Sequence, residues 1–221
     1  MTLYIPQGEP YGNEKPRGTH SLNANSPLVG SKSTFFAFND LGVFDAAYSS
    51  EGSTTADGAM DESGLVFDGV KHAGLSGARE DFSGSEFTAV GQFLVTSYDA
   101  AWSTMIGTDG NFLRFKIHLN TNGTVTLQAL SYMAGAWRTS NQAQVPGVSE
   151  GDSLTFSVTH DQPSYIACIA KNAEAFVVTP TKSYGAPIDD QGGALIFGAE
   201  TTADLSPTIG TLNNLLITNK V

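Results

Sequence analysis

The sequence predicts an all-β protein, an antiparallel two-sheet jelly-roll sandwich with an extended N-terminal arm. The 221 residues include 24 Gly, and Ser, Thr and Asn lie between short apolar runs throughout. No stretch keeps helical periodicity for more than about three turns. Apolar and polar residues instead alternate in short runs that end at Gly, Asn, Asp or Pro, the pattern of strands joined by tight turns.

The first 33 residues have a different composition from the rest. They contain four prolines, Pro6, Pro10, Pro16 and Pro27. They also lack a periodic pattern, which predicts an arm rather than a folded unit. We therefore expect an arm over residues 1–33 and one sandwich domain over residues 34–221, a length that single β-sandwiches commonly reach.

The N-terminal half of the expected domain contains three strand signals. TFFAF at 34–38 is the first, and an acidic loop rich in Gly and Ser is expected over about 49–64. LVFDGV at 65–70 predicts a strand followed by an Asp-Gly turn. EFTAVGQFLVTS at 86–97 predicts the next buried strand.

Residues 112–130 predict a hairpin. Apolar residues alternate with Arg, Lys, His, Thr and Gln on both sides of Asn122-Gly123, a typical turn dipeptide. The apolar set is Leu113, Phe115, Ile117, Leu119, Val125, Leu127 and Ala129. One face of this hairpin is expected to be core and the other exposed.

The C-terminal part predicts five more strands, at 152–161, 165–170, 174–179, 194–200 and 212–219. The total is about nine or ten strands, enough for two antiparallel sheets packed face to face. Cys168 is the single cysteine, so it cannot form an internal disulfide, and its apolar surroundings predict a core residue.

The charge balance excludes two partner classes. Eleven Lys and Arg stand against 22 Asp and Glu, for a net charge of −11. This charge repels phosphate backbones and anionic lipid, so neither nucleic acid nor membrane is expected as a partner. The first residues do not form a secretory signal, and no run reaches the roughly 18 apolar residues of a membrane span. Synthesis in the cytoplasm, with release by lysis for any role outside the cell, is therefore expected.

A collinear set of short motifs runs through the domain, at 67–69, 87–93, 106–112, 120–125, 157–161, 196–199 and 209–219. This order, from FDG through NTNGTV and SVTHD to IFGA and the final strand, resembles the LamG-like or concanavalin A-like lectin/glucanase superfamily. The resemblance covers roughly residues 65–221 and implies a lectin-like jelly roll.

A second resemblance lies in the lead-in, HSLNANSPLVGSKSTFFAFND at 20–40. It is similar to the opening of LamG-like proteins encoded by tailed bacteriophages and prophages. This implies a virion structural protein, a head decoration or fibre-type component made in the host cytoplasm, with phage capsid or tail proteins as partners. The alternative is a carbohydrate-binding module for cell-surface or extracellular polysaccharide.

Catalysis is not expected. Related glycosidases carry two or three carboxylates at alternate positions of one strand, and no such strand occurs here. The four histidines are far apart in sequence without metal-ligand spacing, and His118 and His160 are interpreted as surface residues.

Calcium is the one metal that the sequence suggests, although no cofactor is required. Asp99, Asp109 and Asn111 lie in expected loops and offer the oxygen ligands that calcium prefers. An ordinary Asp-Gly-Asn turn explains the same residues.

A glycan platform is the expected form of any binding site. Aromatic rings stack on sugar faces while polar groups bond the hydroxyls. The candidates around the hairpin are Trp102, Arg114, Lys116, His118, Gln128, Tyr132 and Trp137. The alternative is that the aromatic residues only cover the sandwich edge.

The arm carries three apolar side chains, Tyr4, Ile5 and Tyr11, between its prolines. Such a segment gains by lying extended along another surface. We expect it to anchor the protein to a capsid subunit or to another copy in a homo-oligomer, with a trimer as one arrangement.

Overall fold

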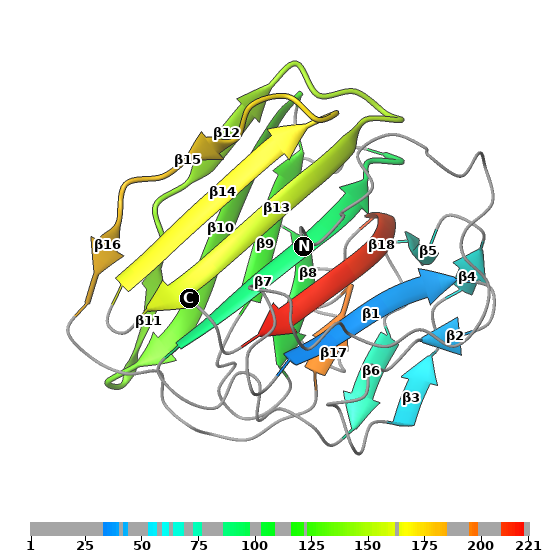
Figure 1. The fold of residues 1–221 in the computed structure, drawn as a ribbon, viewed down its shortest axis with the longest axis horizontal. Coiled ribbons are helices and arrows are strands. Elements are labelled where there is room, and N and C mark those ends of the chain that lie inside the picture. The colour runs from blue at the N-terminus through cyan, green and yellow to red at the C-terminus, as the bar shows by residue number, and fades with distance from the viewer. Residues whose placement is uncertain are drawn as a thin grey trace, which may run out of the picture.

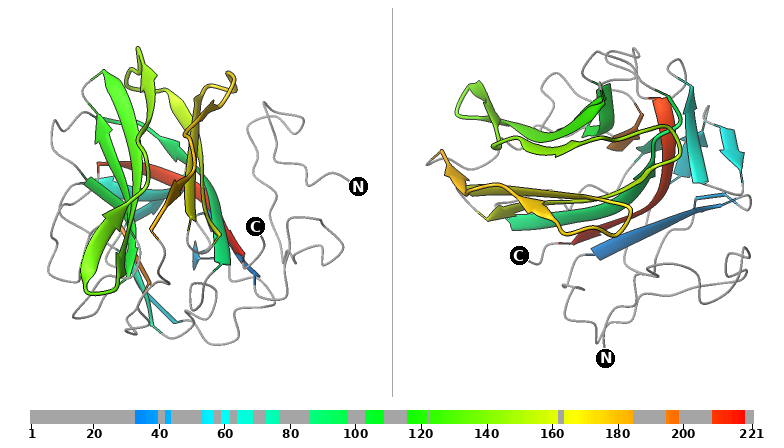
Figure 2. Two further views of the ribbon diagram at one scale, coloured as in Figure 1. Left: turned by 90° about the vertical axis from the view of Figure 1, so that its left-hand side faces the viewer. Right: turned by 90° about the horizontal axis from the view of Figure 1, so that it is seen from above.

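The computed structural model is an antiparallel β-sandwich of two sheets, which confirms the expected fold class (Figures 1 and 2). The structure describes residues 33–39, 42–43, 53–56, 59–61, 64–68, 73–76, 86–97, 103–108, 116–121, 123–161, 164–184, 195–198 and 209–218, some of them by backbone alone. Residues 1–32, and with them almost all of the expected arm, lie outside this part. The described strands pair only in the antiparallel sense.

Eighteen strands make up the described part of the fold. They are β1 Ser33–Asn39, β2 Gly42–Val43, β3 Ser53–Ala56, β4 Ala59–Asp61, β5 Gly64–Asp68, β6 Ala73–Ser76, β7 Glu86–Leu94, β8 Ser103–Thr108, β9 Lys116–Thr121, β10 Thr124–Met133, β11 Ala136–Thr139, β12 Ala143–Pro146, β13 Ser153–Asp161, β14 Ser164–Lys171, β15 Val177–Val178, β16 Lys182–Ser183, β17 Leu195–Phe197 and β18 Ile209–Thr218.

The larger sheet has ten strands and runs in the order β15-β14-β13-β7-β18-β1-β2, with β16 also on β14 and the β4–β5 pair on β18. Its middle strands have the alternating sequences that the jelly roll requires. In β7 the buried residues occupy every second position from Phe87 to Phe93, and β13 repeats this from Leu154 to His160. Its outer face carries Thr, Ser, Gln and Asn, as in the bond from Asn214 Nδ2 to Gln92 Oε1 at 2.9 Å.

The smaller sheet has eight strands in the order β11-β10-β9-β8-β17-β6-β3, with β12 beside β11 on the same edge of β10. The expected hairpin is formed by β9 and β10, the third and second strands in this order. Gly123 has a φ of +81°, the left-handed conformation that the expected Asn-Gly turn needs. Figure 2 shows this sheet as a separate layer facing the larger one.

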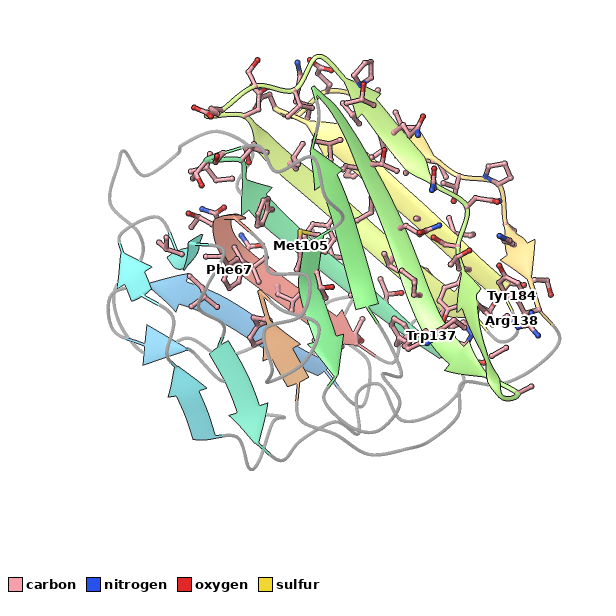
Figure 3. The ribbon with its side chains drawn as sticks, turned by 180° about the vertical axis from the view of Figure 1, so that it is seen from behind. Phe67, Met105, Trp137, Arg138 and Tyr184 are labelled. Atoms are coloured by element: carbon pink, nitrogen blue, oxygen red, sulfur yellow. The ribbon has the colours of Figure 1, made fainter. Side chains whose placement is uncertain are left out.

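The core lies between the two sheets and is mostly aromatic and aliphatic. Phe67 and Met105, 1% and 0% exposed, come from opposite sheets and mark this layer (Figure 3). Gly91 lets Phe156 lie directly on β7, because a Cβ there would be 2.6 Å from Phe156 Cζ and 2.8 Å from the Asn214 carbonyl oxygen. The opening motif at 67–69 therefore begins with a core residue, as expected.

Several expectations about single elements were wrong. The loop expected over 49–64 contains β3 and β4, which gain hydrogen bonds by pairing with neighbouring strands. The strand expected over 174–179 shrinks to β15, whose two valines are exposed because they form a sheet edge. Cys168 lies half-buried on the outer side of β14, because Ala167 and Ile169 take the inward positions.

His160 is also misplaced by the sequence interpretation. It is fully buried, not on the surface, because it continues the inward positions of β13. Its ring packs between Phe87, with centroids 5.6 Å apart, and Tyr165, with centroids 4.5 Å apart.

Candidate functional site

The most distinctive polar feature of the described surface lies where the edges of the two sheets meet. Strand β11 ends one edge of the smaller sheet, and β16 lies on the facing edge of the larger one. We call Trp137, Arg138, Lys182 and Tyr184 the β11–β16 corner. Figure 3 shows Trp137, Arg138 and Tyr184 together at this corner of the molecule.

A tight hairpin positions the first half of the corner. Ala134 and Gly135 form the two-residue turn between β10 and β11, and both have positive φ, 48° and 75°. Positive φ at both central residues is the mark of a type I′ turn, whose twist matches that of the strands. The turn fixes the register that puts Trp137 opposite Tyr132 and Arg138 opposite Ser131.

Tyr184 joins the two sheets. Its hydroxyl donates to the Thr139 carbonyl oxygen and accepts a hydrogen bond from the Thr139 N–H at 3.2 Å. Its ring packs against the hydrophobic core. A second link, from Asn141 Nδ2 to the Pro180 carbonyl oxygen at 2.8 Å, lies beside it. The corner therefore rests on two sheet edges that are bonded to each other.

Two cations share the Tyr184 ring. The guanidinium carbon of Arg138 lies 5.6 Å from the ring centroid and Lys182 Nζ lies 5.3 Å from it, both within the range of cation–π attraction. In the part of the chain that the structure describes, neither cation forms an ion pair and Arg138 donates no hydrogen bond. Lys182 Nζ makes a long hydrogen bond, 3.5 Å, to Thr139 Oγ1.

Lys171, by contrast, lies among carboxylate and carbonyl oxygens. Its Nζ lies 4.0 Å from Asp152 and 3.9 Å from Glu174, and it donates to the Gly147 carbonyl oxygen at 3.0 Å. Among the described lysines and arginines, the positive charge of Lys171 is thus balanced by carboxylates, whereas those of Arg138 and Lys182 are not.

The corner also changes the acidity of Tyr184. Burial raises its pKa, and this is the largest single effect. Lys182 and the hydrogen bonds with Thr139 together outweigh burial, so the pKa of the phenol lies below its ordinary value. The direction of the shift agrees with a site of positive potential.

Trp137 exposes its side chain at this corner. It is 41% exposed, unusual for so large an apolar residue. The other large exposed apolar residues of the described surface are Phe176, Val177 and Val178, in and before the edge strand β15. An exposed indole on an edge strand can stack on the face of a planar or ring-shaped ligand.

The structure brings five of the seven expected glycan-binding residues onto three adjacent strands. Lys116 and His118 are in β9, Gln128 and Tyr132 in β10, and Trp137 in β11. His118 is directly opposite Gln128, and Tyr132 is directly opposite Trp137. Trp102 and Arg114 lie outside the described residues.

The remaining expected sites cannot be placed. Asp99, Asp109 and Asn111, the calcium candidates, lie outside the described residues, as do Tyr4, Ile5 and Tyr11 of the arm. Within the described residues, no three His, Cys, Asp or Glu side chains are grouped closely enough to hold a metal ion.

Sequence reasoning missed Arg138, Lys182 and Tyr184. Arg138 is more than forty positions before Lys182 and Tyr184, so it becomes their neighbour only because the sheet edges meet. One local signal was available, since Trp137 and Arg138 lie close after the Ala134-Gly135 turn, and aromatic and cationic side chains are common ligand groups.

Known proteins resemble this chain in their three-dimensional structure. No family model and no curated protein matches the sequence. Among the described residues there is no helix that could cross a membrane. The fold, by contrast, is similar to many solved domains.

Three of those solved structures illustrate the range. Domain 4 of AbnA, a GH43 extracellular arabinanase from Geobacillus stearothermophilus in complex with arabinotriose, has a TM-score of 0.58 at 13% identity over 86% of this chain and 93% of that one. The binding domain of botulinum neurotoxin serotype D has a TM-score of 0.56 at 8% identity, over 86% and 48%. Tailspike protein 2 from an Escherichia coli O157:H7 bacteriophage has a TM-score of 0.52 at 12% identity, over 85% and 26%. At these identities the likeness is one of fold alone: the chain is a β-sandwich similar to the matched parts of these proteins.

Proposed function

We propose that this chain is a non-enzymatic, glycan-binding protein of a bacteriophage particle. The observation that carries the binding half is the β11–β16 corner, where one edge strand carries an exposed indole on one side and, on the other, a cation with unused hydrogen-bond donors. Sugars are bound by this combination, because an aromatic ring covers their apolar face and polar groups bond their hydroxyls. The fold alone would not support a function, so the proposal depends on the corner.

The absence of an enzymatic role is part of the same proposal. The sequence offers no strand with alternating carboxylates for acid and nucleophile. Asp152, one of the described carboxylates, is engaged in a turn through Ser149 N–H at 2.7 Å and Asn172 Nδ2. When the protein is incubated with a glycan that it binds, the length of the glycan chain should therefore stay unchanged.

The binding half is tested on a glycan array with wild type and Trp137→Ala. We expect the variant to lose about tenfold or more in affinity, since aromatic stacking and its area supply much of the energy in such sites. Phe176→Ala is the matched control, because Phe176 is 46% exposed but lies before β15, away from the corner. Repeating the array in EDTA tests the calcium alternative at Asp99, Asp109 and Asn111. If no glycan binds wild type at high concentration, the binding half is wrong.

The particle half is supported by two separate observations. The lead-in at 20–40 resembles phage-encoded proteins, and a phage tailspike contains a domain of this fold. Mass spectrometry of purified particles is the test, and absence of the chain from them would end the idea.

The anchoring arm has its own test. Because β1 begins at Ser33 and pairs with β18, the deletion should stop at residue 32. We expect this deletion to release the protein from the particle while the sandwich stays folded. Retention of the shortened protein on particles would contradict an anchoring role for Tyr4, Ile5 and Tyr11.

A further inference from the structure

We propose that the β11–β16 corner selects glycans that carry carboxylate groups, and that it binds them as polymers running across the sheet edge. This inference rests on the proposed glycan binding and adds the chemical class of the ligand. Its basis is the pair of cations on Tyr184.

The first step is the local charge. Arg138 and Lys182 can be no more than about 11 Å apart, because their charged groups lie 5.6 and 5.3 Å from the same ring centroid. No described carboxylate forms an ion pair with either. The protein as a whole has twice as many acidic as basic residues, 22 against 11. A corner with two unpaired cations is thus a local exception on a surface that otherwise repels polyanions.

The second step is the hydrogen-bonding capacity. A guanidinium has five N–H donors in a planar fork that matches a carboxylate. Within the described part of the chain Arg138 donates none of them, and its known contact is with the face of the Tyr184 ring. A carboxylate would satisfy two of these donors at once and form charge-assisted bonds, which are stronger than bonds to a neutral hydroxyl.

The third step is rigidity. Tyr184 is bonded to the Thr139 backbone through both its donor and its acceptor capacity. The cations rest on a ring that is itself fixed between two sheets, so less freedom is lost when a ligand binds. Positioning by fixed sheet edges is also what separates this pair from two mobile surface lysines.

The last step concerns the shape of the ligand. Neighbouring residues of a strand point to opposite faces, so Trp137 and Arg138 lie on the two sides of the edge strand β11. Arg138 faces the other sheet, as its contact with Tyr184 requires. A ligand that uses both the indole and the cations must cross the edge, which suits a chain of sugars better than a single terminal sugar.

The experiment compares matched polymers on the full chain. Polygalacturonate and its methyl ester have the same backbone and differ in the charge of the carboxyl group, and dextran sulfate and dextran report on sulfate instead. Binding is measured by calorimetry at about 20 mM and about 200 mM NaCl, because screening should weaken a charged site. We expect polygalacturonate to bind at least about tenfold more tightly than its methyl ester and dextran sulfate, because the fork of Arg138 matches a planar, charged carboxylate.

The variants locate the site. R138Q/K182Q should lose about tenfold or more of the polygalacturonate affinity, whereas K171Q, with the same charge change per residue, should lose less than about twofold. Lys171 lies about 20 Å from Lys182, six residues along β14 from the partner position Tyr165. R138K keeps the charge but lacks the fork, so a clear partial loss is expected from it even if the double variant folds poorly.

The outcomes separate the two proposals. If the methyl ester or dextran sulfate binds as well as polygalacturonate, or if R138Q/K182Q and R138K bind like wild type, the selectivity for carboxylates is overturned. Glycan binding itself would then still stand, provided that Trp137→Ala weakens it. If none of the four polymers and no glycan of the array binds, the proposed function fails and this inference fails with it.

Discussion

Tyr184→Phe should loosen the contact between the two sheets by an amount that the structure allows us to estimate. The change removes only the hydroxyl that donates to the Thr139 carbonyl oxygen and accepts from the Thr139 N–H. An intramolecular hydrogen bond contributes about 0.5–1.5 kcal/mol net, and a donor left without a partner in the interior costs about 1–3 kcal/mol. Because Tyr184 is half-buried, water can reach part of this site. We therefore expect a loss of about 1–2 kcal/mol in the free energy of unfolding.

Urea unfolding followed by tryptophan fluorescence measures this loss. With a urea slope near about 3 kcal/mol per molar, the midpoint should fall by about 0.5 M. Thr139→Val is the control, because it removes the side-chain hydroxyl near Lys182 and keeps both backbone groups that Tyr184 uses. The control should change stability by less than about 0.5 kcal/mol. A Tyr184→Phe protein as stable as wild type, or a control equally destabilised, would refute the role given to the hydroxyl.

Three further predictions test other parts of the structure. Gly91→Ala should lower the free energy of unfolding in urea by about 1–3 kcal/mol, because the new Cβ would press on Phe156 and on the Asn214 carbonyl oxygen. Adding Phe156→Leu should restore only part of this loss, and a Gly91→Ala protein more stable than wild type would contradict this packing. The Ser149 N–H, Asn172 and Lys171 hold the pKa of Asp152 below its ordinary value, although burial opposes them. The stabilisation by the ionised carboxylate is therefore complete above the ordinary pKa and is lost as pH falls through the pKa in the folded protein. The free energies of unfolding of wild type and Asp152→Asn should therefore converge in acid. A difference between them that does not change with pH would exclude the ionised carboxylate as its cause. Burial raises the pKa of the Cys168 thiol, so in the folded protein this thiol should react with Ellman's reagent several-fold more slowly than free cysteine. After unfolding it should react about as fast as free cysteine. A rapid reaction in the folded protein would contradict the half-buried position of Cys168.

The regular strands could be predicted from the sequence because burial on one face imposes a two-residue period. In β13, Leu154, Phe156 and Val158 alternate with polar residues, and the structure follows this pattern. The same pattern includes His160, which the sequence interpretation set on the surface because it lies near the strand end. The period was the better guide there, since the residues paired with His160 on the two neighbouring strands, Phe87 and Tyr165, are aromatic and pack on its ring.

The corner could not be predicted in the same way. Its strands β11 and β16 have four and two residues, too short for a period to be visible. Each forms only because a longer strand, β10 or β14, offers an edge to pair with. Arg138 meets the Tyr184 ring through sheet stacking, a long-range effect that no local pattern encodes.

The pairing of the first and last strands has a mechanical consequence. Ser33 of β1 lies directly opposite Thr218 of β18 in an antiparallel pair. Tension applied through segments before residue 33 and after residue 218 would therefore pull on one backbone pair at a time and peel β1 away, rather than shear the whole ladder. Thr218 lies in register with Thr88, Thr159 and Ile166 on successive strands. Ile166 is next to Tyr165, the residue of β14 that pairs with Lys182. The force would thus act on the sandwich about four strand spacings, roughly 19 Å, from the β11–β16 corner. The hydrogen bonds between the sheet edges at the corner would stay unstrained until β1 had separated from β18.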